Sequence, residues 1–282
     1  MSQDPEQDPL RRALGMIFDH EGWDQRKRAD AMRKIEANLA EPVRLIGVGQ
    51  TGVGKTELLR SIFNINDGDV EVLRKLRTDS TRSETKGFFS FTINSNGYKI
   101  QFTDGPGLGE DRRRDPKYLA DWIAEIPKHD LLYWVMDSSS RDVSHIQENM
   151  KAILDRTGFR DRFVLILNKV DKIELEGDDL AAGHAGWNLD YNMPTRKLEA
   201  QIRRRTDDVI EKFKDYCDLD KSYIVVCSAL RRWNHDKVLD AMLDCLPKEK
   251  RLKASLNKDV KSATDLMAPE IKARVLKDAE KK

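Results

Sequence analysis

Four short strings of residues, each after an apolar run, constrain the fold of this chain of 282 residues more than any other feature. They are GQTGVGKT (49–56), DGPG (104–107), NKVD (168–171) and SAL (228–230). The apolar runs before them, such as VRLIGVG and FVLILNK, are typical of strands that are buried on both faces of a parallel sheet. Because such sheets bind ligands at the carboxyl ends of their strands, we expect the four strings to form one site.

Apolar runs and helix-type segments alternate along most of the chain, which predicts an α/β fold. Strands of the parallel type are expected at 43–49, 130–137, 163–169 and 223–229. Runs 88–93 and 98–104 flank the turn sequence NSNG and predict an antiparallel hairpin. Helices are expected at 10–40, 55–64, 116–126, 142–157, 195–216 and 235–246. Together they predict a three-layer, doubly wound, six-stranded and mostly parallel sheet.

The sequence also predicts an appendage on each side of this domain, which is expected to span 42–246. Residues 1–41 are expected to be a helical extension, with Gly22 between two helices and Pro42 at the end of the second. Residues 247–282 are expected to be a basic helical tail, since eleven Lys or Arg there face six Asp or Glu.

Composition argues against several classes of protein. Lys and Arg number 50 and Asp and Glu 49, and the resulting charge of +1 does not fit a general nucleic-acid coat. Three cysteines without C-x-x-C spacing do not fit a disulfide scaffold or a zinc site. The polar, acidic start is not a signal peptide, and no apolar run approaches the roughly 18 residues of a transmembrane helix. We therefore expect a cytoplasmic protein.

Taken together, the four strings resemble the guanine-nucleotide signature of the Ras-like P-loop GTPases over roughly 43–246. The chain looks like a member of the translation-factor-related class, in the Era/TrmE/septin-like group, and like small bacterial stand-alone Era-like G proteins. This resemblance implies that the chain binds GTP and GDP with Mg²⁺, that it hydrolyses GTP slowly, and that it is a molecular switch. Segments 66–86 and 105–116 are expected to differ between the GTP and GDP states.

The first two strings carry the expected phosphate and metal chemistry. Glycines at 49, 52 and 54 let the backbone curl so that its N–H groups face phosphates. Lys55 is expected to reach the β- and γ-phosphates, and Thr56 and Asp104 to hold Mg²⁺. Gly107 offers a backbone N–H to the γ-phosphate. The residues expected to contact the phosphates in the first string are Gly49, Gln50, Thr51, Gly52, Val53, Gly54, Lys55 and Thr56.

The last two strings are expected to recognise the base. Guanine presents two adjacent donors, which the carboxylate of Asp171 can accept and which adenine lacks. Asn168 would bind the base edge and brace the phosphate loop, and Lys169 would lay its stem along the ring. Ser228 and Ala229, followed by Leu230, would complete the pocket, with the Ala229 N–H at the guanine carbonyl.

A threonine between the first two strings should close over the γ-phosphate and Mg²⁺. Thr81 and Thr85 are both candidates. We favour Thr81 as a catalytic and metal-binding residue, because DSTR resembles the string before the second strand in Era-like, TrmE-like and dynamin-like GTPases.

The sequence departs from the Ras-like pattern at Leu108, which stands where those enzymes carry a water-positioning Gln. Arginines near the expected switches are either solvated or catalytic; they are Arg82, Arg112, Arg113, Arg114 and Arg141. We therefore expect slow turnover in the isolated protein. Faster turnover should require a homodimer across the nucleotide site or a partner that supplies an arginine.

Three rival interpretations concern partners. The first is a septin- or dynamin-like assembly protein with incidental hydrolysis, and the second a ribosome- or RNA-bound factor that uses the basic tail. The third is a membrane-surface protein, for which residues 10–18 are a weak candidate helix. Separately, the long segment 173–194, with Trp187 and Tyr191, is either an insertion packed on the following helix or a partner-docking loop.

Overall fold

The structure, a computed structural model, describes residues 19–20, 22, 24–62, 87–95, 98–108, 115–140, 143–176, 186–219, 221–247 and 250. The chain divides into two compact units, Met1–Pro42 and Val43–Lys282. Among the described residues, no helix has both the length and the apolar composition that a membrane crossing needs.

The described part of the first unit is dominated by one helix, α2 (Gln25–Ala40). The side chain of Asp24 caps it by accepting a hydrogen bond from the Lys27 N–H at 2.8 Å. Gly22 lies in the left-handed region with φ +63° and forms a turn just before the helix. The expected helical segment 10–40 is therefore observed at residues 19–20 and 25–40, while residues 10–18 lie outside the described part of the chain.

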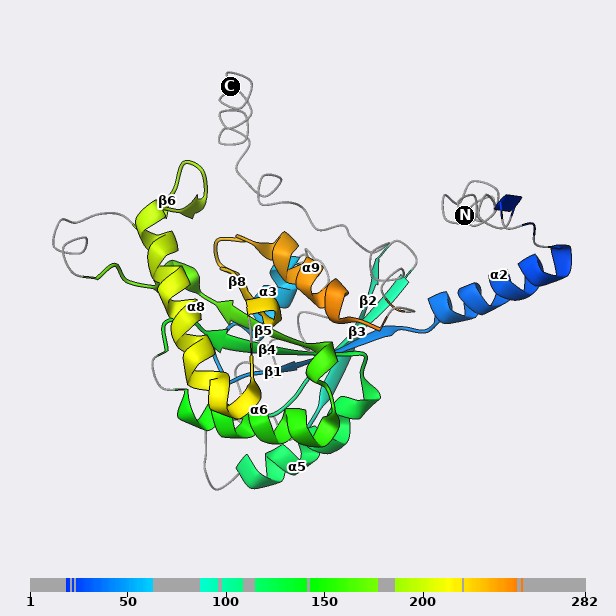
Figure 1. Ribbon diagram of the computed structural model, residues 1–282, viewed down its shortest axis with the longest axis horizontal. Helices are drawn as coiled ribbons and strands as arrows, with labels where there is room; N and C mark the ends of the chain where they lie inside the picture. The colour runs from blue at the N-terminus through cyan, green and yellow to red at the C-terminus, as the bar shows by residue number, and fades with distance from the viewer. Residues whose placement is uncertain are drawn as a thin grey trace, which may run out of the picture. The chain divides into compact units, whose positions relative to one another are not determined.

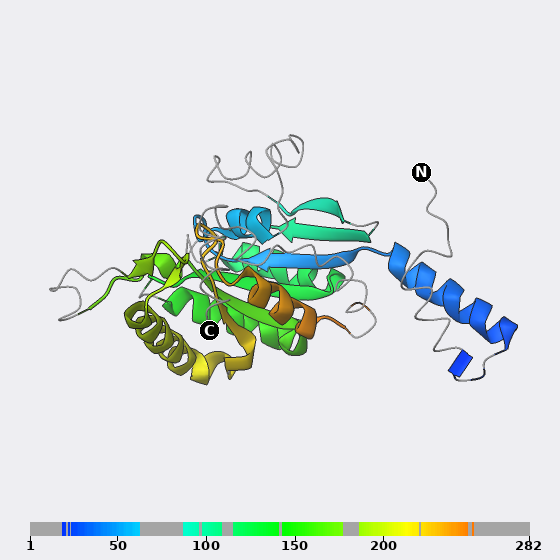
Figure 2. The same ribbon diagram turned by 90° about the horizontal axis from the view of Figure 1, so that it is seen from above.

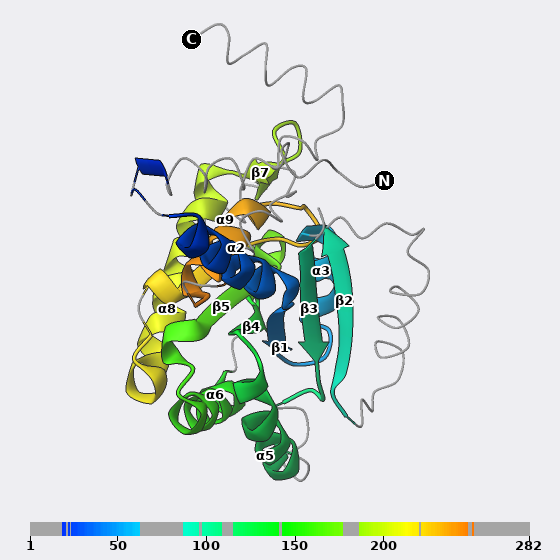
Figure 3. The same cartoon turned by 90° about the vertical axis from the view of Figure 1, so that its right-hand side faces the viewer.

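The second unit is built on one mixed sheet with the strand order β2-β3-β1-β4-β5-β8. Its strands are β1 (Val43–Val48), β2 (Phe89–Ser95), β3 (Tyr98–Asp104), β4 (Leu131–Asp137), β5 (Phe163–Asn168) and β8 (Ile224–Val226). All neighbours are parallel except the β2–β3 hairpin, which lies at one edge of the sheet in Figure 3. This confirms the expected six-stranded, mostly parallel sheet.

Helices cover both faces of this sheet, as Figures 1 and 2 show. On one face α3 and α9 pack over a cluster that includes Val53, Tyr133 and Ala229. On the other face α5, α6 and α8 pack over a cluster that includes Leu108 and Trp122. The helices are α3 (Lys55–Ile62), α5 (Asp115–Glu125), α6 (Ser144–Thr157), α8 (Arg196–Cys217) and α9 (His235–Cys245). Short 3-10 helices are η2 (Ile126–Lys128), η3 (Arg160–Arg162), η4 (Val170–Lys172) and η5 (Lys221–Tyr223).

A second, small sheet was not expected from the sequence. Segment 173–194 contains a small antiparallel pair, β6 (Trp187–Asn188) and β7 (Met193–Pro194), which was predicted only as a loop. Strands of two residues are too short for an alternating pattern to reveal them. Trp187 is 9% exposed and packs in a third apolar cluster with Leu198 and Ile202 of α8, so its packing agrees with the interpretation as an insertion on the following helix.

Candidate nucleotide-binding site

The backbone between β1 and α3 forms a curled loop over residues 49–54, called the phosphate loop below, with three glycines at positive φ. Gly49, Gly52 and Gly54 have φ values of +153°, +77° and +92°. A Cβ atom at Gly49 would lie 2.4 Å from the Val135 carbonyl oxygen, and one at Gly54 would lie 2.6 Å from Nδ2 of Asn168. Both the loop conformation and its neighbours therefore exclude side chains at these positions.

Lys55 folds back over this loop. Its ammonium donates hydrogen bonds to the carbonyl oxygens of Gly49 at 2.9 Å and Gln50 at 3.4 Å. The same nitrogen lies 3.9 Å from Oδ1 of Asp104 at the end of β3. Thr56 follows it, half-buried, in the first turn of α3. The ammonium, the hydroxyl-bearing residue and the carboxylate thus come from β3 and the start of α3, at the carboxyl edge of the sheet.

Tyr133 packs over Gly47, next to Asp104 in the sheet. Gly47 of β1 lies in register with Asp104 on one side and with Tyr133 of β4 on the other. A Cβ atom at Gly47 would lie 2.3 Å from the Tyr133 hydroxyl oxygen, so only glycine leaves room for this ring. Burial, aided by the negative charge of Asp104, raises the pKa of Tyr133 well above its ordinary value. The hydroxyl therefore stays protonated, and we did not anticipate this neighbour of the carboxylate from the sequence.

The DGPG segment is attached to α5. The indole N–H of Trp122 donates to the Pro106 carbonyl oxygen at 3.0 Å, and the Gly105 N–H donates to Asp104 Oδ1 at 3.0 Å. Leu108 is only 1% exposed and belongs to the apolar cluster under α5. An apolar residue at this position is therefore explained by core packing, and its side chain is not placed to orient water.

Asn168, at the end of β5, connects three parts of the site. Its Nδ2 donates to the Val53 carbonyl oxygen at 2.9 Å, and its Oδ1 accepts from the Ala229 N–H at 2.9 Å. The side chain is 1% exposed. The brace to the phosphate loop has the form expected from the sequence. The Ala229 N–H, expected at the guanine carbonyl, donates here to Asn168 and satisfies a buried amide oxygen.

Lys169 has a left-handed backbone, with φ +63°, and a side chain that reaches back toward the phosphate loop. Its Nζ donates to the Gly52 carbonyl oxygen at 2.6 Å and lies 2.7 Å from Oδ2 of Asp137. Asp137 ends β4 and is in register with Asn168. Burial opposes ionisation of Asp137, but hydrogen bonds from Lys169 and Ser139 outweigh it and hold the pKa of this carboxyl below its ordinary value. The sequence analysis missed Asp137.

The other residues that the sequence predicts at the base lie on η4 and on the loop after β8. The hydroxyl of Ser228, which is fully buried, donates to Oδ1 of Asp171 and accepts from the Arg231 N–H at 3.0 Å. Leu230 is 71% exposed on the same loop. Residues from all four strings therefore lie at the carboxyl ends of β1, β3 and β5 and just beyond β8. Thr81, Thr85, Arg82, Arg112, Arg113, Arg114 and Arg141 lie outside the described residues.

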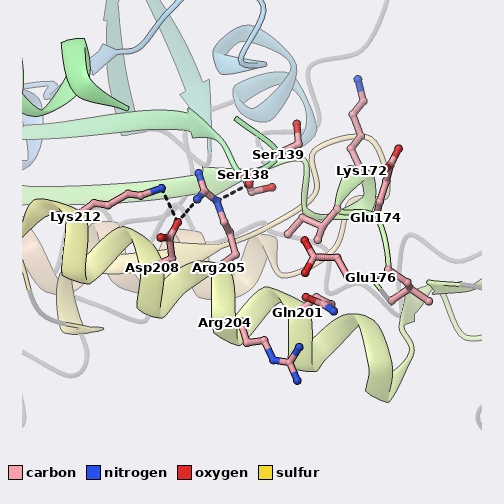
Figure 4. A pocket seen from close by; sticks show the side chains of 12 residues that line it. Ser138, Ser139, Lys172, Glu174, Glu176, Gln201, Arg204, Arg205, Asp208 and Lys212 are labelled. Carbon is pink, nitrogen blue, oxygen red and sulfur yellow. Dashed lines mark hydrogen bonds and ion pairs between the residues drawn. The ribbon is translucent and has the colours of Figure 1, made fainter. Parts of the chain in front are cut away.

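A separate cavity of about 1220 Å³ lies between α8 and the segments that follow β4 and η4 (Figure 4). Its described lining comes from Ser138 and Ser139, from residues 172–176 and from one side of α8. No described residue of the four strings lines it, so it is distinct from the candidate site.

Comparison with known proteins supports a GTPase-type domain. Residues 44–169 match the family model described as 50S ribosome-binding GTPase. This segment runs from β1 through the DGPG segment to Lys169 of the NKVD string.

The curated relatives share low sequence identity with this chain and are longer than it. The chain is 22% identical over 210 residues to YfjP of Escherichia coli (strain K12), an uncharacterized protein; the match covers 74% of this chain and 63% of YfjP. It is 27% identical over 198 residues to the ATP-dependent Clp protease ATP-binding subunit ClpC of Staphylococcus epidermidis, covering 64% of this chain and 23% of ClpC. The chain thus spans less than two thirds of the length of these relatives.

Among solved structures, Toc33 from Arabidopsis thaliana in complex with Mg²⁺ and GMPPNP aligns with a TM-score of 0.46 and 15% identity. The alignment covers 83% of this chain and 89% of Toc33.

Proposed function

We propose that this protein binds GTP, hydrolyses it to GDP with Mg²⁺, and acts as a molecular switch. The observation that carries the proposal is the position of Asn168. Its buried amide forms hydrogen bonds with Val53 of the phosphate loop and with Ala229 of the loop after β8, so one side chain would join the two halves of a nucleotide site. The match of residues 44–169 to a GTPase family model supports the same chemistry.

At the phosphate end, Lys55 and the N–H groups of residues 49–54 bind the phosphates, with Gly107 at the γ-phosphate. Thr56 and Asp104 hold Mg²⁺. No group of three or more His, Cys, Asp or Glu among the described residues would hold a metal alone. That donor set still fits Mg²⁺, which commonly takes one or two protein oxygens and completes its shell with phosphates and water. Thr81 is proposed to close over the same ion and to act in catalysis.

At the base end, Asp171 selects guanine. Its carboxylate has Ser228 as a hydrogen-bond donor and would accept both donors of the guanine edge. The proposed base contacts are Asn168, Lys169, Asp171, Ser228, Ala229 and Leu230. ClpC is an ATP-binding subunit by its name, but an adenine edge would leave the Asp171 carboxylate without the donors it needs.

A second candidate function is nucleotide-dependent assembly, and one observation favours it. The buried side chain of Leu108 leaves the site without a group at that position to orient water. In this case a second copy, or a partner that supplies an arginine, would complete the catalytic site. As part of the leading proposal, we also propose that the protein belongs to the Era/TrmE/septin-like class of GTPases and is cytoplasmic.

A ribosomal or RNA partner is a third part of the proposal. The matching family model is described as ribosome-binding, and the sequence 247–282 is net basic. Binding through such a tail should weaken steeply as salt rises, because counterions released from the nucleic acid drive it.

The test is GTP turnover per monomer, measured with Mg²⁺ over a range of protein concentrations. Isolated Ras turns over at roughly 3–5 × 10⁻⁴ s⁻¹, and we expect a similarly slow basal rate. A rate that rises with concentration would favour the assembly function. A flat, slow rate would favour a switch that depends on another protein. Absence of both GTP binding and turnover would refute the proposal.

A further inference from the structure

The loop that follows β4, residues 138–140, is held in place from α8. Arg205 of α8 donates through Nε to the Ser138 carbonyl oxygen at 2.9 Å and through Nη2 to the Ser140 carbonyl oxygen. Its Nη1 pairs with Asp208 one turn further along the helix, and Lys212 lies 3.0 Å from the same carboxylate. Figure 4 shows the Arg205 guanidinium directed toward Ser138 and Asp208.

This loop in turn orients the carboxylate of Asp137. The N–H and the hydroxyl of Ser139 donate to its Oδ1 at 3.0 and 2.6 Å. Its Oδ2 faces the ammonium of Lys169 at 2.7 Å. Both carboxylate oxygens are therefore occupied, and the plane of the group is defined by contacts on both sides.

Lys169 needs such a partner. A left-handed backbone costs a non-glycine residue about 1 kcal/mol or more, so surrounding contacts must stabilise it. The contacts of its side chain are the ion pair with Asp137 and the hydrogen bond to the Gly52 carbonyl oxygen, and its own carbonyl oxygen accepts from the Lys172 N–H at 2.9 Å. The paired side chains are only 21% and 22% exposed, so solvent screens them less than a typical surface pair.

From these contacts we propose that Arg205 and Asp137 form a positioning relay that fixes Lys169 against the phosphate loop and so sets the lifetime of the bound guanine nucleotide. Arg205 holds the loop, the loop orients Asp137, and Asp137 places the lysine whose stem lies along the base. Because the relay touches the lysine ammonium and no edge of the base, it affects how long a nucleotide stays and not which base is chosen. The inference rests on the proposed function.

The test measures dissociation of fluorescent GDP and fluorescent IDP from the full chain with Mg²⁺. Loss of a charge-assisted hydrogen bond in Asp137→Asn should speed release of both nucleotides about tenfold and leave their ratio unchanged. Arg205→Gln, which acts one step further away, should speed release about threefold. Asp137→Glu, which keeps the charge, should restore part of the lifetime.

Two further variants separate positioning from general destabilisation. Asp155 on α6 is an exposed, ion-paired aspartate with Lys151 and Arg160, and Asp155→Asn should leave release unchanged. Lys169→Met combined with Asp137→Asn should release GDP no faster than Lys169→Met alone, because the two residues act through one contact.

The outcomes are distinguishable. Wild-type protein that binds no GDP would contradict the proposed function itself. Wild-type protein that binds GDP, with unchanged release from Asp137→Asn or with additive effects in the double variant, would overturn the relay alone. A changed ratio of GDP to IDP release in Asp137→Asn would also overturn it, since that result would place Asp137 in base selection.

Discussion

The residues proposed to bind the base are joined to one another by side-chain hydrogen bonds, whereas those proposed to bind the phosphates depend mainly on backbone conformation. Asn168 and Ser228 are buried and fully engaged with neighbouring loops. The phosphate loop depends on glycines at positive φ, and its lysine contacts carbonyl oxygens. A substitution at Asn168 or Ser228 should therefore disturb both folding and binding, while truncation of the Lys55 side chain should disturb mainly binding.

The largest expected effect concerns Asp171, which is proposed to select guanine. Asp171→Asn should move the preference from GTP toward XTP by on the order of 10⁴-fold, because xanthine offers an acceptor where guanine offers a donor. Competition between the two nucleotides in a binding assay measures this ratio. Retained preference for GTP in the variant would refute the role of Asp171.

Asn168→Ala should lower both the stability of the fold and the affinity for nucleotide. Removing the amide leaves the Val53 carbonyl and the Ala229 N–H without their partner, at about 1–3 kcal/mol for each buried group. We expect the free energy of unfolding to fall by about 3 kcal/mol and nucleotide affinity to fall with it. Urea unfolding and GDP titration measure the two effects. Loss of affinity at unchanged stability would contradict the comparison.

Lys55→Ala should separate the two effects. Removal of the ammonium should lower GTP affinity about 100-fold, because charged hydrogen bonds to phosphate are lost. Stability should change by less than about 1 kcal/mol, since its partners are two loop carbonyls and, at the longer distance of 3.9 Å, the Asp104 carboxylate. Lys151→Ala on α6 is the matched control. A large loss of stability in Lys55→Ala would show that this lysine is structural.

Acid should lower the free energy of unfolding through His235, the first residue of α9. Neither ring nitrogen has a hydrogen-bond partner among the described residues, and burial, partly opposed by the Ser228 backbone, lowers the pKa of His235 to about 4. The unfolded chain takes up this proton near the ordinary pKa of about 6.5, so stability falls as pH drops from there toward 4. By pH 5 the loss should be about 2 kcal/mol.

His235→Leu should flatten this part of the pH profile in chemical unfolding, whereas His20→Leu, at an exposed position, should not. Some slope should remain, since burial also lowers the pKa of His129. A profile for His235→Leu identical to that of the wild type would contradict the assignment.

The sheet and the positions of the four strings could be predicted because their signals are local. Continuous apolar runs identified β1, β4 and β5, and the turn sequence at 94–97 identified the hairpin. The role of Asp137 could not be predicted, because it depends on the register that places it beside Asn168. Tyr133 was missed for the same reason, since its ring needs Gly47 on the adjacent strand. The β6–β7 pair was too short to leave a pattern.

The Trp122 indole gives this protein an intrinsic optical probe. It donates to Pro106 in the DGPG segment, and its ring meets Phe88 edge-on with centroids 4.8 Å apart, just before β2. One fluorophore therefore senses two segments that lie next to the expected switches. With the other four tryptophans replaced by Phe, its emission should shift when GTP replaces GDP. That signal would allow stopped-flow kinetics of the switch to be recorded without any label on the nucleotide.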